Sequence, residues 1–309
     1  MRRIISSSFF VLSVLIIFVF TTSCNFQKEK NNTENFPDVE FSYNLVDWDK
    51  TINYDGTPIS LTLEIYNNEA YAEFGIMIFI NGIIQEFTTY EHTECKYMQK
   101  YNFQSKQQKT IEISLSPQSV NIGEYELVVI MLINPSFMAT EPNYVFGYNH
   151  KISYAYTNIK INSNTDLKLN TMTVEKSNII DDTEKNKYIS DNINRLELTA
   201  YCIMMNENKE ENRKIFLNGN DLNVNFKVLG GSSAKYRVTT FINHEPILIN
   251  EKYNNAILES SFDRYSIFSC DYANVKLQEQ NVIYSIAIPI DNIKDNSFPI
   301  KSDSVVIIK

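Results

Sequence analysis

Apolar and polar residues alternate along this chain with a period of two. This pattern is typical of half-buried β-strands, whose successive side chains point to opposite faces of a sheet. It is clearest at residues 60–66 and 111–115. Residues 124–133 (EYELVVIMLI) are instead apolar on both faces from Leu127 onward. That segment predicts a central strand covered on both sides.

The sharpest local signal is the segment FINGII at residues 79–84. Its centre, Asn81-Gly82, stands between apolar flanks that favour strands. A type I′ turn needs positive φ at both central positions, and Asn and Gly adopt such values at low steric cost. The segment therefore predicts a two-residue β-hairpin.

The second half of the chain repeats the strand pattern after a polar break. Residues 162–166 (NSNTD) form that break, and we place a domain boundary there. Residues 181–194 (DDTEKNKYISDNIN) are the best helix candidate, but only three apolar side chains would line its face, so a loop with one helical turn fits equally well. Strand patterns resume at 167–174, 196–204, 222–228, 236–243, 282–288 and 304–308.

Many short strands with few helical segments predict an all-β chain. The length fits two tandem antiparallel β-sandwich domains, Ig-like in architecture, at residues 37–163 and 167–309. A weak repeat links them, because FIN at residues 79–81 recurs at 241–243. Two further matches are an apolar segment at 111–115 and 275–277 and a strand ending before proline at 133–135 and 287–289. Both duplication and chance similarity between sandwiches explain these matches.

The first 24 residues follow a different pattern. Two arginines precede a stretch at residues 4–20 that is apolar apart from four serines, and small residues at 21–23 lead to Cys24. This order is that of a cleaved secretory signal. The apolar stretch falls short of the ~20 apolar residues that a membrane-spanning helix needs.

The charged start, the apolar stretch and Thr22-Ser23-Cys24 resemble the signal and lipobox of bacterial lipoproteins. The third position before the cysteine is Thr21, where that class usually has leucine. The resemblance implies that residues 1–23 are removed, that Cys24 carries a lipid, and that the chain is anchored to the cell membrane outside the cytoplasm. The polar segment at 24–36 would be a tether. The alternative is an ordinary secretory signal with Cys24 incidental.

Charge excludes one class of partner. The chain has 28 basic and 37 acidic residues, and removing residues 1–23 takes away two arginines and no acid, which leaves a net charge of −11. Nucleic-acid binding depends on basic patches that neutralise phosphates, so we expect no nucleic-acid partner. Besides the membrane, a protein or a cell-wall glycan would fit as partner.

The mature chain would hold three cysteines besides Cys24, namely Cys95, Cys202 and Cys270. An odd number leaves at least one thiol unpaired within the chain. Cys202 and Cys270 fall in strand-like segments and could form a disulfide, which an exported location permits. The alternative is that all three are free thiols, since free cysteine is among the residues most often buried.

Catalytic and metal-binding motifs are sparse. There is no HExxH, GxSxG or P-loop pattern, and the three histidines are far apart. His92, Glu94 and Cys95 offer three metal ligands within four residues, but a structural zinc needs four, and a polar loop is the simpler interpretation. We expect no metal and no cofactor.

Two other segments could form binding surfaces. Asp47-Trp48-Asp49 could place two carboxylates and an aromatic ring beside a sugar, although solvated carboxylates and a tryptophan in the core are the simpler interpretation. Aromatic residues also gather in two groups, which could form a binding surface or fill a core: Tyr90, Tyr97, Tyr101 and Phe103, then Tyr144, Phe146 and Tyr148.

The sequence therefore favours a membrane-anchored extracytoplasmic protein that acts as a binding, adhesion or structural module and not as an enzyme. Two alternatives stay open. One is a carbohydrate-active enzyme that uses Asp47 or Asp49, and the other is an accessory subunit of a membrane export or transport complex.

Overall fold

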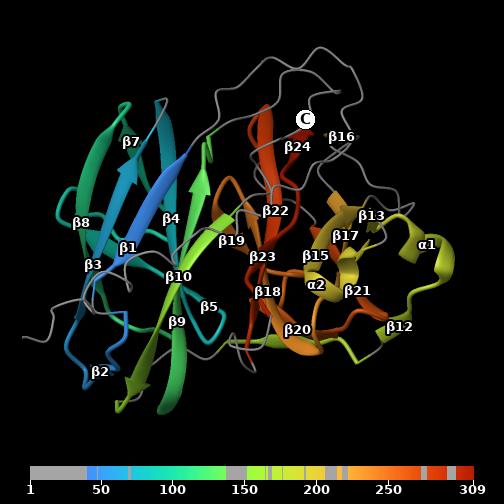
Figure 1. Ribbon diagram of the computed structural model, residues 1–309, viewed down its shortest axis with the longest axis horizontal. Coiled ribbons are helices and arrows are strands. Elements are labelled where there is room, and N and C mark those ends of the chain that lie inside the picture. The colour runs from blue at the N-terminus through green and yellow to red at the C-terminus, as the bar shows by residue number, and fades with distance from the viewer. Residues whose placement is uncertain are drawn as a thin grey trace, which may run out of the picture. The chain divides into compact units, whose positions relative to one another are not determined.

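The computed structural model describes residues 40–46, 48–68, 71–136, 152–163, 165, 169–175, 177–190, 193–205, 214–217, 222–272, 277–290 and 297–309. They belong to one compact unit that spans residues 37–309. Nearly all of its elements are strands, and they form two β-sandwiches, as the alternating pattern predicts (Figure 1). The predicted signal, the tether and Cys24 lie outside the described residues.

The first sandwich consists of two sheets. The outer sheet has the order β1 (Phe41–Leu45), β3 (Ile59–Asn67), β8 (Gln107–Leu115), β6 (Phe87–Thr89). The inner sheet has the order β2 (Ile52–Tyr54), β10 (Ile152–Ile161), β9 (Gly123–Ile133), β4 (Ala72–Ile80), and both β5 (Ile83–Gln85) and β7 (Gln99–Phe103) pair with β4. All these pairs are antiparallel except β2 with β10.

The second sandwich is built in the same way. Its inner sheet has the order β11 (Thr171–Thr173), β20 (Asn255–Ser260), β18 (Ala234–Ile242), β22 (Gln280–Pro289), β24 (Val305–Ile308), β16 (Lys214–Phe216). In this sheet β19 (Glu245–Ile247) pairs with β18, and β23 (Ile300–Lys301) pairs with β22. Its outer sheet has the order β12 (Ser177–Ile179), β21 (Arg264–Tyr272), β17 (Leu222–Gly230), β15 (Ala200–Met205).

The segment predicted as helix or loop contains a single helical turn, α1 (Asp182–Asn186), which Asp181 caps by accepting a hydrogen bond from Glu184 N at 2.8 Å. A short ribbon of β13 (Ile189–Ser190) and β14 (Ile193–Asn194) follows, then α2 (Arg195–Leu198). The prediction of a strand from residue 196 was therefore wrong at its start. The Leu196 side chain is buried against Ile180 and Leu229 on the outer sheet, and this contact holds the turn in place.

Each sandwich has its own apolar core. In the first, Phe74 and Phe103 meet edge to face at 5.0 Å, and both are fully buried. In the second, Phe226 stacks on Phe268 at 5.4 Å. Full burial of one such side chain contributes about 1.5–3 kcal/mol. These cores account for the alternating strands, whose outward residues are polar.

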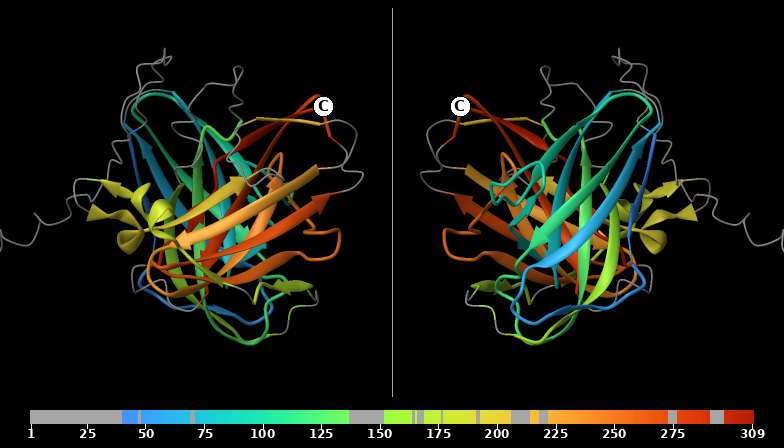
Figure 2. Two further views of the ribbon diagram at one scale, coloured as in Figure 1. Left: turned by 90° about the vertical axis from the view of Figure 1, so that its right-hand side faces the viewer. Right: turned by 90° about the vertical axis from the view of Figure 1, so that its left-hand side faces the viewer.

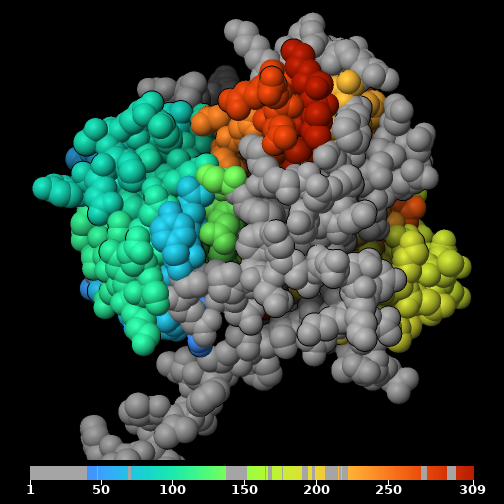
Figure 3. All heavy atoms as spheres, turned by 90° about the horizontal axis from the view of Figure 1, so that it is seen from above, coloured from blue at the N-terminus to red at the C-terminus, as the bar shows by residue number. Residues whose placement is uncertain are grey.

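A third apolar cluster lies between the two sandwiches, and we call it the joint. The first sandwich contributes the outward faces of β4 and β9, and the second contributes those of β18 and β22 (Figures 1 and 2). The space-filling view also shows the C-terminal strands beside the first sandwich (Figure 3). The buried members of the joint are Met77, Phe79, Met98, Val128, Ile130, Leu132, Phe241, Val282, Tyr284, Ile286 and Ile288.

The joint explains why residues 127–133 are apolar on both faces. Leu127 and Val129 point into the core of the first sandwich, whereas Val128 and Ile130 point into the joint. The prediction of a central strand covered on both sides is confirmed. One of its two covers is the other sandwich, which the pattern alone did not identify.

The central strands of the two sandwiches have the same order, because β1-β3-β8 corresponds to β15-β17-β21 and β2-β10-β9-β4 corresponds to β16-β24-β22-β18. The strands β4 and β18 are equivalent, and each ends in a two-residue turn with positive φ. These turns are Asn81-Gly82 (52° and 71°) and Asn243-His244 (50° and 73°). The first turn confirms the predicted hairpin, and the repeated FIN motif occupies equivalent positions. The other two matches were wrong in detail. The equivalent of residues 111–115 lies on β21 and not at 275–277. Strand register pairs Ile133 with Phe74 and Pro289 with Tyr236. Ile133 therefore corresponds to Pro289, two residues from its predicted match at residue 287.

Candidate functional site

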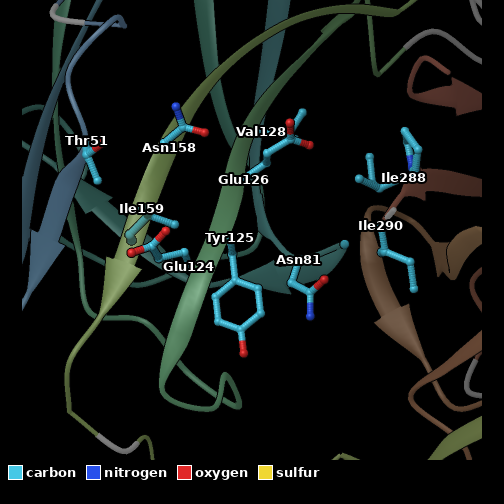
Figure 4. A pocket seen from close by; sticks show the side chains of 12 residues that line it. Thr51, Asn81, Glu124, Tyr125, Glu126, Val128, Asn158, Ile159, Ile288 and Ile290 are labelled. Carbon is cyan, nitrogen blue, oxygen red and sulfur yellow. The ribbon is translucent and has the colours of Figure 1, made fainter. Parts of the chain in front are cut away.

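A pocket of about 590 Å³ opens where the joint ends (Figure 4). On β9, the apolar outward residue Val128 is followed toward the strand start by Glu126 and then Glu124, which line the pocket on the same face. Strand register places Asn158 of β10 directly opposite Glu126. The face of this sheet therefore changes from apolar to polar at the point where the second sandwich no longer covers it.

The opposite wall of the pocket comes from the second sandwich. Ile288, Pro289 and Ile290, at the end of β22, line it together with the Asn81-Gly82 turn of the first sandwich. Figure 4 shows Glu124, Tyr125 and Glu126 on one strand and Ile288 and Ile290 across from them. The pocket thus has a polar wall and an apolar wall, and each sandwich supplies one of them.

Gly82 allows the two sandwiches to approach closely at this pocket. A Cβ atom on Gly82 would lie 2.8 Å from Arg237 Cβ and 3.2 Å from Ile290 Cγ2, and its φ of 71° already favours glycine. The Arg237 guanidinium donates a hydrogen bond to the Asn81 carbonyl at 2.7 Å. Burial lowers the pKa of Arg237 from its usual value. The contact fixes the turn of one sandwich on a strand of the other.

His244 occupies the position equivalent to Gly82 in the other turn. Its imidazole is buried, and Nδ1 lies 3.0 Å from the Tyr284 hydroxyl. Burial, with smaller effects from Lys100 and Lys301, lowers the pKa of His244 to about 3, so the ring is neutral at pH 7. A large side chain therefore fills the surroundings of this turn, whereas at Gly82 residues Arg237 and Ile290 of the other sandwich lie directly against the backbone.

Charges at the pocket are balanced. Glu124 forms an ion pair with Lys160 across β9 and β10, at 3.0 Å between Oε1 and Nζ. Glu126 is the second carboxylate, and Arg237 lies beside Gly82. Two carboxylates and two cations thus lie in or next to one pocket, together with the uncharged hydrogen-bonding groups of Asn81, Asn158, Thr51 and Tyr125.

The buried Lys301 is a feature that sequence analysis missed. Its Nζ donates hydrogen bonds to the Ser302 carbonyl at 2.9 Å and to Ser304 Oγ at 2.7 Å, and it lies 4.6 Å from the centre of the Tyr284 ring. Burial lowers the pKa of Lys301 to about 7, against smaller opposing effects of Asp303 and Cys202. A single lysine in a polar C-terminal segment carries no sequence signal for such burial.

The two cysteines considered for a disulfide are free and buried. Cys202 lies on β15 opposite Val228, and Cys270 lies on β21 opposite Val224, so β17 separates them. The Cα atoms of the two cysteines are therefore separated by two strand spacings, roughly 9.5 Å or more. A disulfide needs a Cα–Cα distance of less than about 7 Å. The bridge considered for this pair is therefore not formed, and burial raises the pKa of each thiol to about 12.

We expect thiol labelling to follow this burial. In the Cys24→Ala variant, Cys95 is exposed and should react with a thiol reagent in the native state. Cys202 and Cys270 are buried and should react only after unfolding. A titration without reductant should therefore give one thiol in the native protein and three in denaturant. A count of one in denaturant would show that the pair is oxidised.

The other predicted site residues do not converge. The His92 ring packs edge to face on Tyr101 at 4.9 Å, and Glu94 pairs with Lys96 at 2.7 Å. No three potential metal ligands come together within the described ranges. His150 and Asp47, with the aromatic group at 144–148, lie outside those ranges. Trp48 is 59% exposed, so the interpretation that it fills the core was wrong.

The aromatic group after the first hairpin divides between core and surface. Tyr101 and Phe103 are buried in the first sandwich, whereas Tyr90 is 90% exposed. Most of the pocket residues were not singled out from the sequence. The available signal was the change within residues 124–133 from alternating polarity to apolar on both faces, because it marks where the joint ends.

The sequence matches no protein-family model and no curated relative. Similar solved structures include a protein of unknown function from Porphyromonas gingivalis W83, with 8% identity, a TM-score of 0.25 and coverage of 86% of this chain and 99% of that chain. The Escherichia coli chaperone DraB has 9% identity, a TM-score of 0.26 and coverage of 86% and 96%. A Salmonella enterica complex of the SafA pilin with the SafB chaperone has 13% identity, a TM-score of 0.23 and coverage of 87% and 97%. Similarity at such low TM-scores does not indicate a function.

Within the described ranges, none of the helices has the length and apolar character required to cross a membrane.

Proposed function

We propose that this chain is a membrane-anchored extracytoplasmic binding module whose ligand site is the pocket beside the joint. The observation that carries the proposal is a pocket with one wall from each sandwich, next to an apolar cluster that fixes the two walls. Ligand pockets occur preferentially at domain interfaces. A site fixed before binding loses less conformational freedom when the ligand arrives.

The anchor is proposed from the N-terminal pattern. One acyl chain gives only marginal membrane binding, whereas two or more hold a protein firmly. A lipidated Cys24 followed by a polar tether would place the two sandwiches outside the cytoplasm, near the membrane surface. There the pocket would meet a protein or a cell-wall glycan.

Removal of the anchor tests the location. We expect Cys24→Ala to move the protein from the membrane fraction to the soluble extracytoplasmic fraction, because the lipid has no other attachment point in this proposal. Cys95→Ala is the matched control, since it removes an exposed thiol and should leave retention unchanged. Membrane retention of the Cys24→Ala protein would contradict the anchor.

The binding role is tested with chemically different probes. The Cys24→Ala chain, labelled for NMR, is titrated with maltose, cellobiose, diacetylchitobiose, a lysine-rich peptide and a glutamate-rich peptide. We expect at least one probe class to shift the amide resonances of Gly82, Glu126 and Asn158 saturably. Shifts confined to other surfaces, or no saturable shift with any probe, would show that the pocket is not a binding site.

A further inference from the structure

We propose that the pocket beside the joint binds an uncharged, hydroxyl-rich ligand, namely a short saccharide. This inference rests on the proposed binding function and adds the chemical class of the ligand. It follows from three properties of the pocket: its balanced charge, its mixture of hydrogen-bond donors and acceptors, and its one apolar wall.

Balanced charge disfavours ionic ligands. Glu124 is already paired with Lys160, and the Arg237 guanidinium already binds the Asn81 carbonyl. An anionic ligand would meet two carboxylates on β9, and a cationic ligand would have to displace Lys160 to pair with Glu124. Burying a charge without a matching partner is unfavourable. An uncharged ligand avoids both costs.

The polar groups match hydroxyls, which both donate and accept. Carboxylate oxygens of Glu126 accept hydrogen bonds, whereas the carboxamides of Asn81 and Asn158 and the hydroxyl of Thr51 can do both.

The second wall offers apolar contact instead of hydrogen bonds. Ile288 and Ile290 lie across from Glu126 and Asn158 (Figure 4), and Pro289 also lines the pocket. A sugar ring has the same division, with hydroxyls at its edge and C–H groups on its faces. A ring with one C–H face on the end of β22 would bring its edge hydroxyls among the polar groups of the lining. Volume is sufficient, since ligand pockets typically measure about 300–1,000 Å³.

The test extends the NMR titration with two variants and a control. We expect Asn158→Ala to weaken saccharide binding about five- to tenfold, because it removes one hydrogen-bonding group. Glu126→Gln should weaken saccharide binding by no more than about tenfold, since an amide oxygen still accepts a hydrogen bond and the ligand carries no charge. Asn44→Ala on β1 of the outer sheet removes an exposed amide that does not line the pocket and should have no effect.

Each outcome decides between the two proposals. Saturable shifts at Gly82 and Asn158 with a saccharide, together with these variant effects, support the saccharide. Shifts at those residues with a charged peptide alone, or complete loss of binding in Glu126→Gln, would overturn the ligand class while the binding function stands. Failure of every probe to reach the pocket would overturn both. Asn158 is exposed, so its replacement leaves the fold intact, which the unchanged remainder of the spectrum verifies.

Discussion

Replacing Phe241 by alanine is expected to lower the free energy of unfolding by about 3–5 kcal/mol. Phe241 is fully buried at the centre of the joint. Its ring meets Phe79 edge to face at 6.5 Å and stacks on Tyr284 at 5.3 Å. The substitution would leave a cavity between the sandwiches, and denaturant unfolding measures the loss.

Hydrogen exchange identifies where that loss acts. Phe79 belongs to β4 of the first sandwich, so Phe241→Ala in the second sandwich should speed amide exchange in β4 and β9. Phe226→Ala is the matched control, because it removes the same ring from the core of the second sandwich. Phe226→Ala should lower the free energy of unfolding by a similar amount without speeding amide exchange in β4. A loss below about 1 kcal/mol in Phe241→Ala, or unchanged exchange in β4, would mean that the joint does not couple the sandwiches.

Lys301→Met is expected to remove a pH-dependent destabilisation. The folded-state pKa of Lys301 is about 7, below the ordinary lysine value of 10.5. Below pH 7 the group is protonated in both states, so the folded protein bears the full penalty of a buried charge. Between pH 7 and 10.5 the unfolded state binds the extra proton, and the stability of the natural chain should rise with pH by about 1.4 kcal/mol per unit.

The groups around Lys301 do not reverse this sign. Asp303 and Cys202 raise its pKa, but burial has the larger effect, and the Ser304 hydroxyl and the Tyr284 ring next to it are uncharged. His244 is affected by Lys301 but titrates near pH 3 in the folded protein, so it is neutral throughout this window.

Chemical denaturation at pH 6, 7.5 and 9 measures the effect. Methionine has similar length and no charge, so the variant should be more stable than the natural chain at pH 6, with a difference that shrinks as pH rises. Lys235→Met is the control, since Lys235 is exposed on β18 and its loss should leave the slope unchanged. If the Lys301→Met variant keeps the full pH dependence of its free energy of unfolding, the titrating group is not Lys301.

Local patterns predicted the elements of this fold well where the governing forces are local. The Asn81-Gly82 hairpin follows from the φ preferences of two residues. The alternating segments at β3 and β8 follow from having one face on a core and one in water. Leu196 shows the limit of such reasoning, because it belongs to α2 and its burial depends on Ile180 and Leu229, which are distant in sequence.

The sequence by itself determined that the chain is all-β, where its main hairpin turns, and which central strand is covered on both sides. These properties depend on residue spacing and backbone preference, which neighbours in sequence express. Only the tertiary structure decided that the second sandwich provides that cover, that Cys202 and Cys270 lie on opposite sides of β17, that Lys301 is buried, and that Glu126 and Asn158 share a pocket with Ile288. Each of these depends on contacts between residues far apart in sequence, and packing, not local propensity, selects such contacts.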